Sequence, residues 1–179
     1  QQFGTEINVK MSRYSLDFIR NCDFETGYEP KGYLFFATDE KQLSFLKQNA
    51  ALQKSLGVKD VEIVDNKQIS EIASGMNCAD IVGGSFCQSD GFINPLLLMK
   101  GFSERAFELG AKIETANEVL KIETKGGKAV AVQTEKGVIE AEKIVLCTGA
   151  WAKDLAKTAG VELPVEPLRR QIIWAQTKE

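Results

Sequence analysis

Residues 141–151 read AEKIVLCTGAW, an apolar run that leads straight into a small, glycine-containing corner. The run at 144–148 is apolar and partly β-branched, which predicts a buried strand. Gly149, Ala150 and Trp151 follow, and the residues beyond them predict a helix. Glycine lets a ligand approach the main chain closely, and the first N–H groups of a helix attract phosphate. The corner therefore predicts either a ligand contact or a plain core anchor at Trp151.

Outward from this corner, the chain alternates helical and extended patterns. Helices are predicted at 8–21, at 39–57, around residues 69–72 and at 95–109. The last of these has Asn94 as N-cap, Pro95 at its first position and Gly110 as its stop. Asp65 or Asn66 is the expected cap of the short helix around residues 69–72. Strands are predicted at 32–38, at 61–65, within 81–95 together with a Ser-Asp-Gly turn, at 111–115 and at 164–177. Three further short strands are predicted around the KGGK and EKG turns. This mixture predicts an α/β or α+β fold.

Composition excludes several kinds of site. The chain has 179 residues, a formal net charge of -3 and no histidine. A weakly acidic chain argues against a nucleic-acid surface, and the missing histidine excludes a histidine base and the common zinc sites. No apolar run is long enough for a membrane span. The four cysteines form no CxxC and match no metal pattern, which predicts buried reduced thiols and a cytoplasmic location, with a Cys78–Cys87 disulfide as the alternative.

The familiar nucleotide and nucleophile motifs are missing from these residues. The sequence contains no GxGxxG, no GxxxxGK[ST] and no GxSxG. Ser85 and Ser89 have no base partner, and Glu104 with Glu108 fits a solvated helix face better than a catalytic pair. No catalytic residue can therefore be assigned from the sequence.

The order of the segments carries a resemblance. GYLFFAT (32–38) is followed by DGFINP (90–95), ELGAKI (108–113), IVLCTGAW (144–151) and LPVEPLRRQ (163–171). This succession resembles the FAD-dependent D-amino-acid-oxidase-like family, in particular its sarcosine oxidase, sarcosine dehydrogenase and glycine oxidase branch. The likeness covers nearly the whole chain.

The resemblance implies a partial Rossmann-like FAD domain interleaved with a mixed-sheet substrate domain. Residues 1–86 are expected in the substrate domain, 87–160 in the FAD domain and 161–179 in a returning substrate-domain strand. Because the family's glycine-rich loop for the FAD pyrophosphate has no counterpart here, we expect an internal fragment. The fragment alone should hold no FAD and be inactive.

The implied activity of the intact protein is oxidation of a small amine or amino acid such as sarcosine, glycine or proline, by hydride transfer to the flavin. A 2-hydroxy-acid or glycerol-3-phosphate dehydrogenase is the alternative among flavoenzymes. A non-catalytic module that binds a ligand or a partner is the alternative from another class. A homo-oligomer or a partner subunit is also expected, since a missing unit would leave sheet surface uncovered.

The resemblance also assigns roles to particular residues. Val119 matches the family valine whose main chain meets the adenine end of FAD. The corner residues Thr148, Gly149, Ala150 and Trp151 match the segment that lines the cofactor. Arg169 and Tyr33 are candidates for substrate binding, because an arginine can hold a carboxylate through two hydrogen bonds. For both, an alternative stays open: a surface ion pair for Arg169 and packing for Tyr33.

Overall fold

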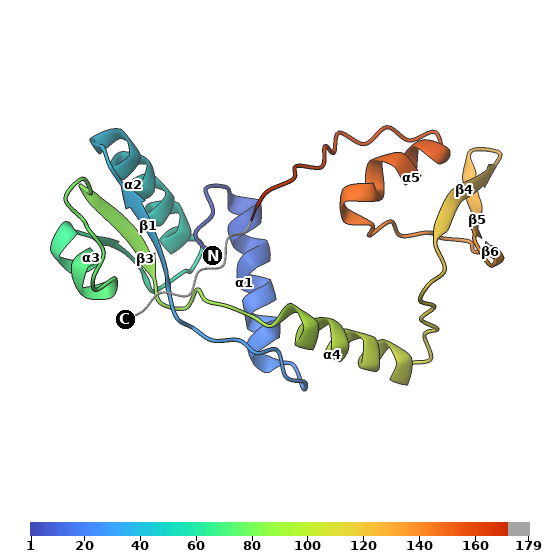
Figure 1. Ribbon diagram of the computed structural model, residues 1–179, viewed down its shortest axis with the longest axis horizontal. Coiled ribbons are helices and arrows are strands. Elements are labelled where there is room, and N and C mark those ends of the chain that lie inside the picture. Colours follow the sequence, from blue (N-terminus) through green and yellow to red (C-terminus); the bar gives the residue numbers. More distant parts are fainter. Residues whose placement is uncertain (172–179) are drawn as a thin grey trace. The chain divides into compact units, whose positions relative to one another are not determined.

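The computed structural model describes residues 1–171, and the chain divides into two compact units between Lys112 and Ile113 (Figure 1). Each unit contains one three-stranded antiparallel sheet together with helices. The expected mixed α/β class is confirmed. Among the described helices, none combines the length and apolar character that crossing a membrane requires.

The sheet of the first unit has β3 (Gly83–Cys87) at its centre, between β1 (Tyr33–Ala37) and β2 (Val61–Val64). Helix α2 (Glu40–Ser55) covers one face, where Ala50 packs with Val61 and Cys87. Helix α3 (Asn66–Ile72) covers the opposite face, where Ile69 packs with Val64, Leu34 and Phe86. Both helices flank the sheet in Figure 1. The two faces thus have separate small cores.

Two further helices complete this unit. Helix α1 (Glu6–Asn21) buries Val9 in the core on the α2 side of the sheet. Helix α4 (Pro95–Glu108) contacts the end of α1 through an aromatic cluster, in which the rings of Phe18 and Phe102 stack 5.4 Å apart and Phe24 meets both edge-on. The last turn of α1 and the first turns of α4 therefore share one apolar contact.

The predicted helix caps are confirmed where they depend on neighbouring residues alone. The Asn94 side chain accepts hydrogen bonds from the N–H groups of Leu96 and Leu97, and Pro95 occupies the first turn. Gly110, just past the end of α4, has a φ of +87°, which suits a helix stop. Asp65, one of the two residues expected to cap α3, does so in a reciprocal capping box with Gln68.

The second unit begins with a meander of β4 (Val119–Lys125), β5 (Lys128–Thr134) and β6 (Gly137–Glu140). The predicted KGGK hairpin is confirmed: Gly126 and Gly127 both have positive φ values, of +61° and +75°, as a two-residue hairpin turn requires. A single 3₁₀ turn, η1 (Gly149–Trp151), then leads into the short helix α5 (Ala152–Thr158).

Three predicted strands are not strands in the described residues. Segments 111–115 and 144–148 are irregular, and so is 164–171, while the rest of the 164–177 prediction lies outside the described residues. A strand needs a neighbour with which its backbone can form a hydrogen-bonded ladder, and apolar composition does not supply one. These segments have no ladder partner within residues 1–171. Ile113 and Val145 are consequently 53% and 84% exposed.

The cysteines are free, but they are not uniformly buried. Cys78 and Cys87 are buried, whereas Cys22 is half-buried and Cys147 is exposed. The expectation of buried thiols is therefore wrong for Cys147. This residue belongs to the segment 144–148, which does not join a sheet and so is not covered by one. The domain limits at residues 86 and 160 stay a prediction, since the compact units follow contacts and not cofactor binding.

Candidate functional site

A pocket of about 1030 Å³ lies within the second unit. One wall is the start of β4, and the other wall is the corner after residue 146 together with α5. The lining residues are Glu118, Val119, Leu120, Cys147, Thr148, Gly149, Trp151, Asp154, Leu155 and Thr158. The volume and the mainly apolar walls are typical of a small-molecule or cofactor site.

Four of the five residues expected to bind the cofactor line this pocket. Val119 comes from the first strand of the meander, and Thr148, Gly149 and Trp151 come from the corner. Ala150 is exposed and is not part of the lining. Trp151 is 75% exposed, so its indole is not the core anchor that the alternative interpretation required. The meander and the corner are thus brought together, although about thirty residues separate them.

Two features of the corner favour a bound ligand: open space at Gly149 and an unused hydrogen-bonding group at Thr148. Gly149 has a φ of +53°, and a Cβ built on it would meet nothing within 4 Å. Beside it, the Thr148 Oγ1 atom is buried, and no hydrogen-bond partner reaches it among the residues that the structure describes. A buried hydroxyl without a partner costs free energy. A ligand in the pocket that offers a donor or acceptor would remove this cost.

The two walls are held together by Thr158 at the end of α5. Its Oγ1 accepts a hydrogen bond from the Ile122 N–H at 2.9 Å and donates one to the Leu155 carbonyl at 2.7 Å. Within residues 1–171, strand β4 is at the edge of its sheet, so no described strand pairs with the Ile122 N–H on that side. No sequence pattern points to Thr158, because a threonine near a helix end is ordinary.

The charges in the pocket restrict which part of a dinucleotide it could hold. The carboxylates of Glu118 and Asp154 both belong to the lining. Ionised carboxylates accept hydrogen bonds from hydroxyl groups and repel phosphate. These acceptors suit the hydroxyl groups of a ribose and disfavour a pyrophosphate. Val119 lines the same pocket, and its contact with the adenine end of FAD stays a prediction.

The two candidate substrate residues belong to different units. Tyr33 is on β1, opposite Cys87 of β3, and is 51% exposed with its ring 4.9 Å from that of Phe35. Arg169 is exposed and lies in an irregular segment of the second unit. The substrate roles of both residues stay predictions.

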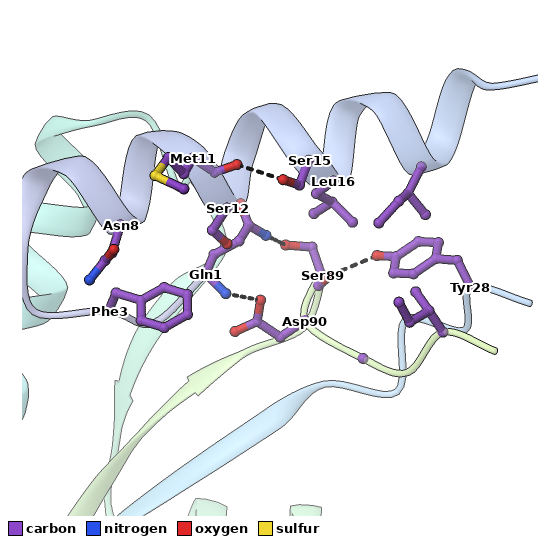
Figure 2. A pocket seen from close by; sticks show the side chains of 13 residues that line it. Gln1, Phe3, Asn8, Met11, Ser12, Ser15, Leu16, Tyr28, Ser89 and Asp90 are labelled. Atoms are coloured by element: carbon purple, nitrogen blue, oxygen red, sulfur yellow. Dashed lines mark hydrogen bonds and ion pairs between the residues drawn. The ribbon is translucent and has the colours of Figure 1, made fainter. Parts of the chain in front are cut away.

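A second pocket, of about 440 Å³, lies in the first unit between α1 and the turn after β3 (Figure 2). The turn is held by the Tyr28 hydroxyl, which donates to the Ser89 carbonyl at 2.6 Å, and by the Gln1 side-chain amide, which donates to Ser89 Oγ at 2.7 Å. The polar groups of this pocket are thus largely occupied by one another.

Beneath this turn, Asp60 accepts hydrogen bonds from the N–H and the hydroxyl of Ser89, at 2.6 and 3.0 Å. Partial burial raises the pKa of Asp60, but the hydrogen bonds from Ser89 outweigh it, and the net pKa is lowered. Burial raises the pKa of the adjacent Cys87 thiol, and the carboxylates of Asp90 and Asp60 raise it further. Cys87 is therefore a structural thiol and not a nucleophile.

Comparisons with known proteins find relatives over most of the chain. The family model described as "DAO: FAD dependent oxidoreductase" matches residues 3–179. Mouse (Mus musculus) mitochondrial sarcosine dehydrogenase is 26% identical over 170 residues, which cover 92% of this chain and 18% of that protein. The mitochondrial pyruvate dehydrogenase phosphatase regulatory subunit of Mus musculus is 27% identical over 155 residues, which cover 84% of this chain and 18% of that protein.

A solved structure shows the same fold over most of the chain. The L-proline dehydrogenase from P. horikoshii superposes with a TM-score of 0.80 at 26% identity, covering 89% of this chain and 43% of that one. The chain therefore spans about a fifth of the curated relatives and less than half of the solved protein.

Proposed function

The chain belongs to the family of FAD-dependent oxidoreductases, and we propose that it is part of an enzyme that oxidises a small amine or amino acid. Sarcosine, glycine and proline define the expected substrate class. Relatives named for sarcosine and for L-proline support this choice. Bound FAD would supply the oxidising chemistry by accepting a hydride from the substrate carbon.

One observation carries the cofactor assignment. Val119, Thr148, Gly149 and Trp151 come from separate segments and line a single pocket. We assign to them the adenosine end of FAD: the indole of Trp151 offers a flat surface for a ring, and the Thr148 hydroxyl offers an unused hydrogen bond. The glycine corner allows the cofactor to approach the backbone.

For the FAD pyrophosphate and for the substrate, the residues of this chain offer fewer candidate contacts. The sequence contains no GxGxxG loop for the pyrophosphate. We therefore propose that the isolated 179-residue chain is colourless and inactive. On the substrate side, Arg169 is proposed to hold a carboxylate, and Tyr33 to contact the substrate from its exposed position on β1.

Two further parts of the proposal concern the setting of the protein. The free thiols favour a cytoplasmic location. Association with a second copy or with a partner subunit is favoured by the large apolar side chains that stay exposed on both units, among them Tyr14, Phe107 and Val145.

A regulatory role is the second candidate, since one relative in the comparison is named as a regulatory subunit. The two candidates differ in catalysis. The test is to assay the intact protein that carries this chain against sarcosine, glycine, proline and glycerol 3-phosphate with an artificial electron acceptor. Turnover of one of the amines is expected. Turnover of glycerol 3-phosphate alone would replace the substrate assignment, and bound FAD without any turnover would support the regulatory role.

A further inference from the structure

Helix α1 leaves a row of large apolar side chains in solvent. Ile7, Met11, Tyr14 and Phe18 are 62%, 60%, 77% and 39% exposed. At about 100° per residue, the four lie within one narrow stripe of the helix. Val9, which is fully buried, is on the opposite side. Within the described residues, the core of the first unit therefore accounts for one face of α1 and leaves this stripe, here called the α1 stripe, largely exposed, with only Phe18 at its end packed against Phe24 and Phe102.

The spacing of the α1 stripe is that of a coiled-coil seam. The residues follow one another at steps of four, three and four, which is the repeat with which two helices pack side chains into each other's gaps. The exposed apolar residues of α4, by contrast, include Leu96, Met99, Phe102 and Phe107, whose steps of three, three and five do not form such a seam. A helix with the same spacing is thus the fitting occupant for α1.

We propose that the α1 stripe binds the α1 stripe of a second copy of this chain in antiparallel orientation. A two-fold axis then places Ile7 opposite Phe18 of the other copy, and Met11 opposite its Tyr14. Ile7, Met11 and Tyr14 each gain an apolar neighbour, and Phe18 adds one to its contacts with Phe24 and Phe102. This inference rests on the association with a second copy proposed above and names its surface; it does not depend on the proposed enzymatic activity.

The charges beside the stripe select the antiparallel orientation. On one flank lie Lys10 and Asp17, and on the other flank lie the uncharged Asn8 and Ser15. In an antiparallel pair like flanks face each other, so Lys10 of each copy lies beside Asp17 of the other, and the symmetry creates this contact twice. A parallel pair would place both charged residues against the uncharged flank. In the antiparallel pair, therefore, neither the charged flanks nor the uncharged flanks bring like charges together.

Existing contacts are compatible with the pairing. Lys10 bonds to Glu6 at 2.5 Å within the helix, but both side chains are more than half exposed, so the ammonium can also meet a second carboxylate. Phe18 is held at one end of the stripe by stacking on Phe102, which reduces the side-chain entropy that the dimer would lose. A contact of two 16-residue helices is small, so a weak, concentration-dependent dimer is expected.

Sedimentation equilibrium of the 179-residue chain over a range of concentrations tests the proposal. Wild type is expected to form a dimer. Lys10→Glu and Asp17→Lys should each weaken it by about tenfold or more, since each places like charges together at both symmetric contacts. The double variant Lys10→Glu/Asp17→Lys should restore the wild-type affinity. Lys100→Glu is the matched control, because Lys100 forms the same kind of i,i+4 pair with Glu104 on α4 and should have no effect.

Three outcomes would overturn the proposal. The first is a wild-type chain that stays monomeric at every concentration. The second is a double variant that is as weak as the single ones. The third is a dimer that is unaffected by Tyr14→Glu, which would place the interface on another surface. Circular dichroism of each variant checks that the fold is kept, as expected for side chains this exposed.

Discussion

At Gly149, both the backbone conformation and the proposed cofactor contact favour a residue without a side chain. The φ of +53° lies in the left-handed region, where a β-branched residue is strained. Gly149→Val should therefore destabilise the fold by about 1–3 kcal/mol, and in the intact flavoenzyme it should also lower the amount of FAD bound per protein. Flavin absorbance after purification measures the occupancy, and denaturant unfolding measures the stability.

Gly160 supplies the control for this variant. Its φ is +75°, it also has open space around a built Cβ, and it lies outside the pocket. Gly160→Val should cost similar stability but leave FAD occupancy unchanged. If both variants lose FAD equally, the loss reports destabilisation of the unit, and the corner has no direct role.

The cysteines offer a chemical probe of the same corner. Cys147 is exposed and lines the pocket, whereas Cys87 is fully buried with a raised pKa. A thiol reagent should therefore modify Cys147 first in the native chain, and reach Cys87 only on unfolding. Mass spectrometry of a timed reaction identifies the modified peptide. Cys147→Ser should remove the fast phase, and persistence of that phase would show that another thiol is the accessible one.

Asp60 makes a pH-dependent contribution to stability. Its pKa is lowered from 3.8 by the hydrogen bonds from Ser89, which outweigh the effect of partial burial. A lowered folded pKa stabilises the fold above the unfolded pKa, and this stabilisation is lost as the pH falls below about 3.8 through the folded pKa. The difference in unfolding free energy between wild type and Asp60→Asn should therefore shrink on acidification. A difference that does not vary with pH would contradict this assignment.

Among the elements, α5 and β4 pack together and are joined by a side-chain hydrogen bond from the Ile122 N–H to the Thr158 hydroxyl. Thr158→Val keeps the shape but removes the acceptor for the Ile122 N–H. We expect a loss of about 1–3 kcal/mol in the unfolding free energy of the second unit, together with weaker FAD binding in the intact enzyme because the pocket walls separate. Thr158→Ser keeps the hydroxyl and should restore both. Equal losses in the two variants would mean that the methyl group, not the hydrogen bond, is what counts.

The elements that could be predicted from the sequence are those determined by neighbouring residues. Asn94 and Asp65 cap their helices through N–H groups two or three residues away, and the KGGK turn needs only its own glycines. The segments 111–115 and 144–148 were wrongly predicted as strands, because a ladder depends on a partner distant in sequence.

The candidate site shows the same limit. No spacing rule connects Val119 to Thr148, and their expected proximity came from the family resemblance. The Thr158 contact depends on where α5 packs, which local sequence does not specify. The exposed Cys147 was missed because its burial had been inferred from the apolar run around it.

At the scale of the whole molecule, burial is divided unequally. The first unit contains both hydrophobic clusters, one on each face of its sheet. The buried apolar residues described in the second unit are only Ile122, Ala131 and Ala156. Since burial of apolar surface is the main stabilising contribution, the two units should not open together.

Native-state hydrogen exchange tests this difference. Amides of β4, β5 and β6 should exchange faster than those of β3, because the second unit opens with a smaller loss of buried apolar surface. Ile69→Ala, which empties the core on the α3 side, should accelerate exchange in β1–β3 and leave β4–β6 unchanged. Equal protection of the two sheets, or acceleration in both, would show that the units unfold as one. In the intact flavoenzyme, removal of FAD should selectively accelerate exchange at β4 and α5, since the proposed pocket lies between them and the corner.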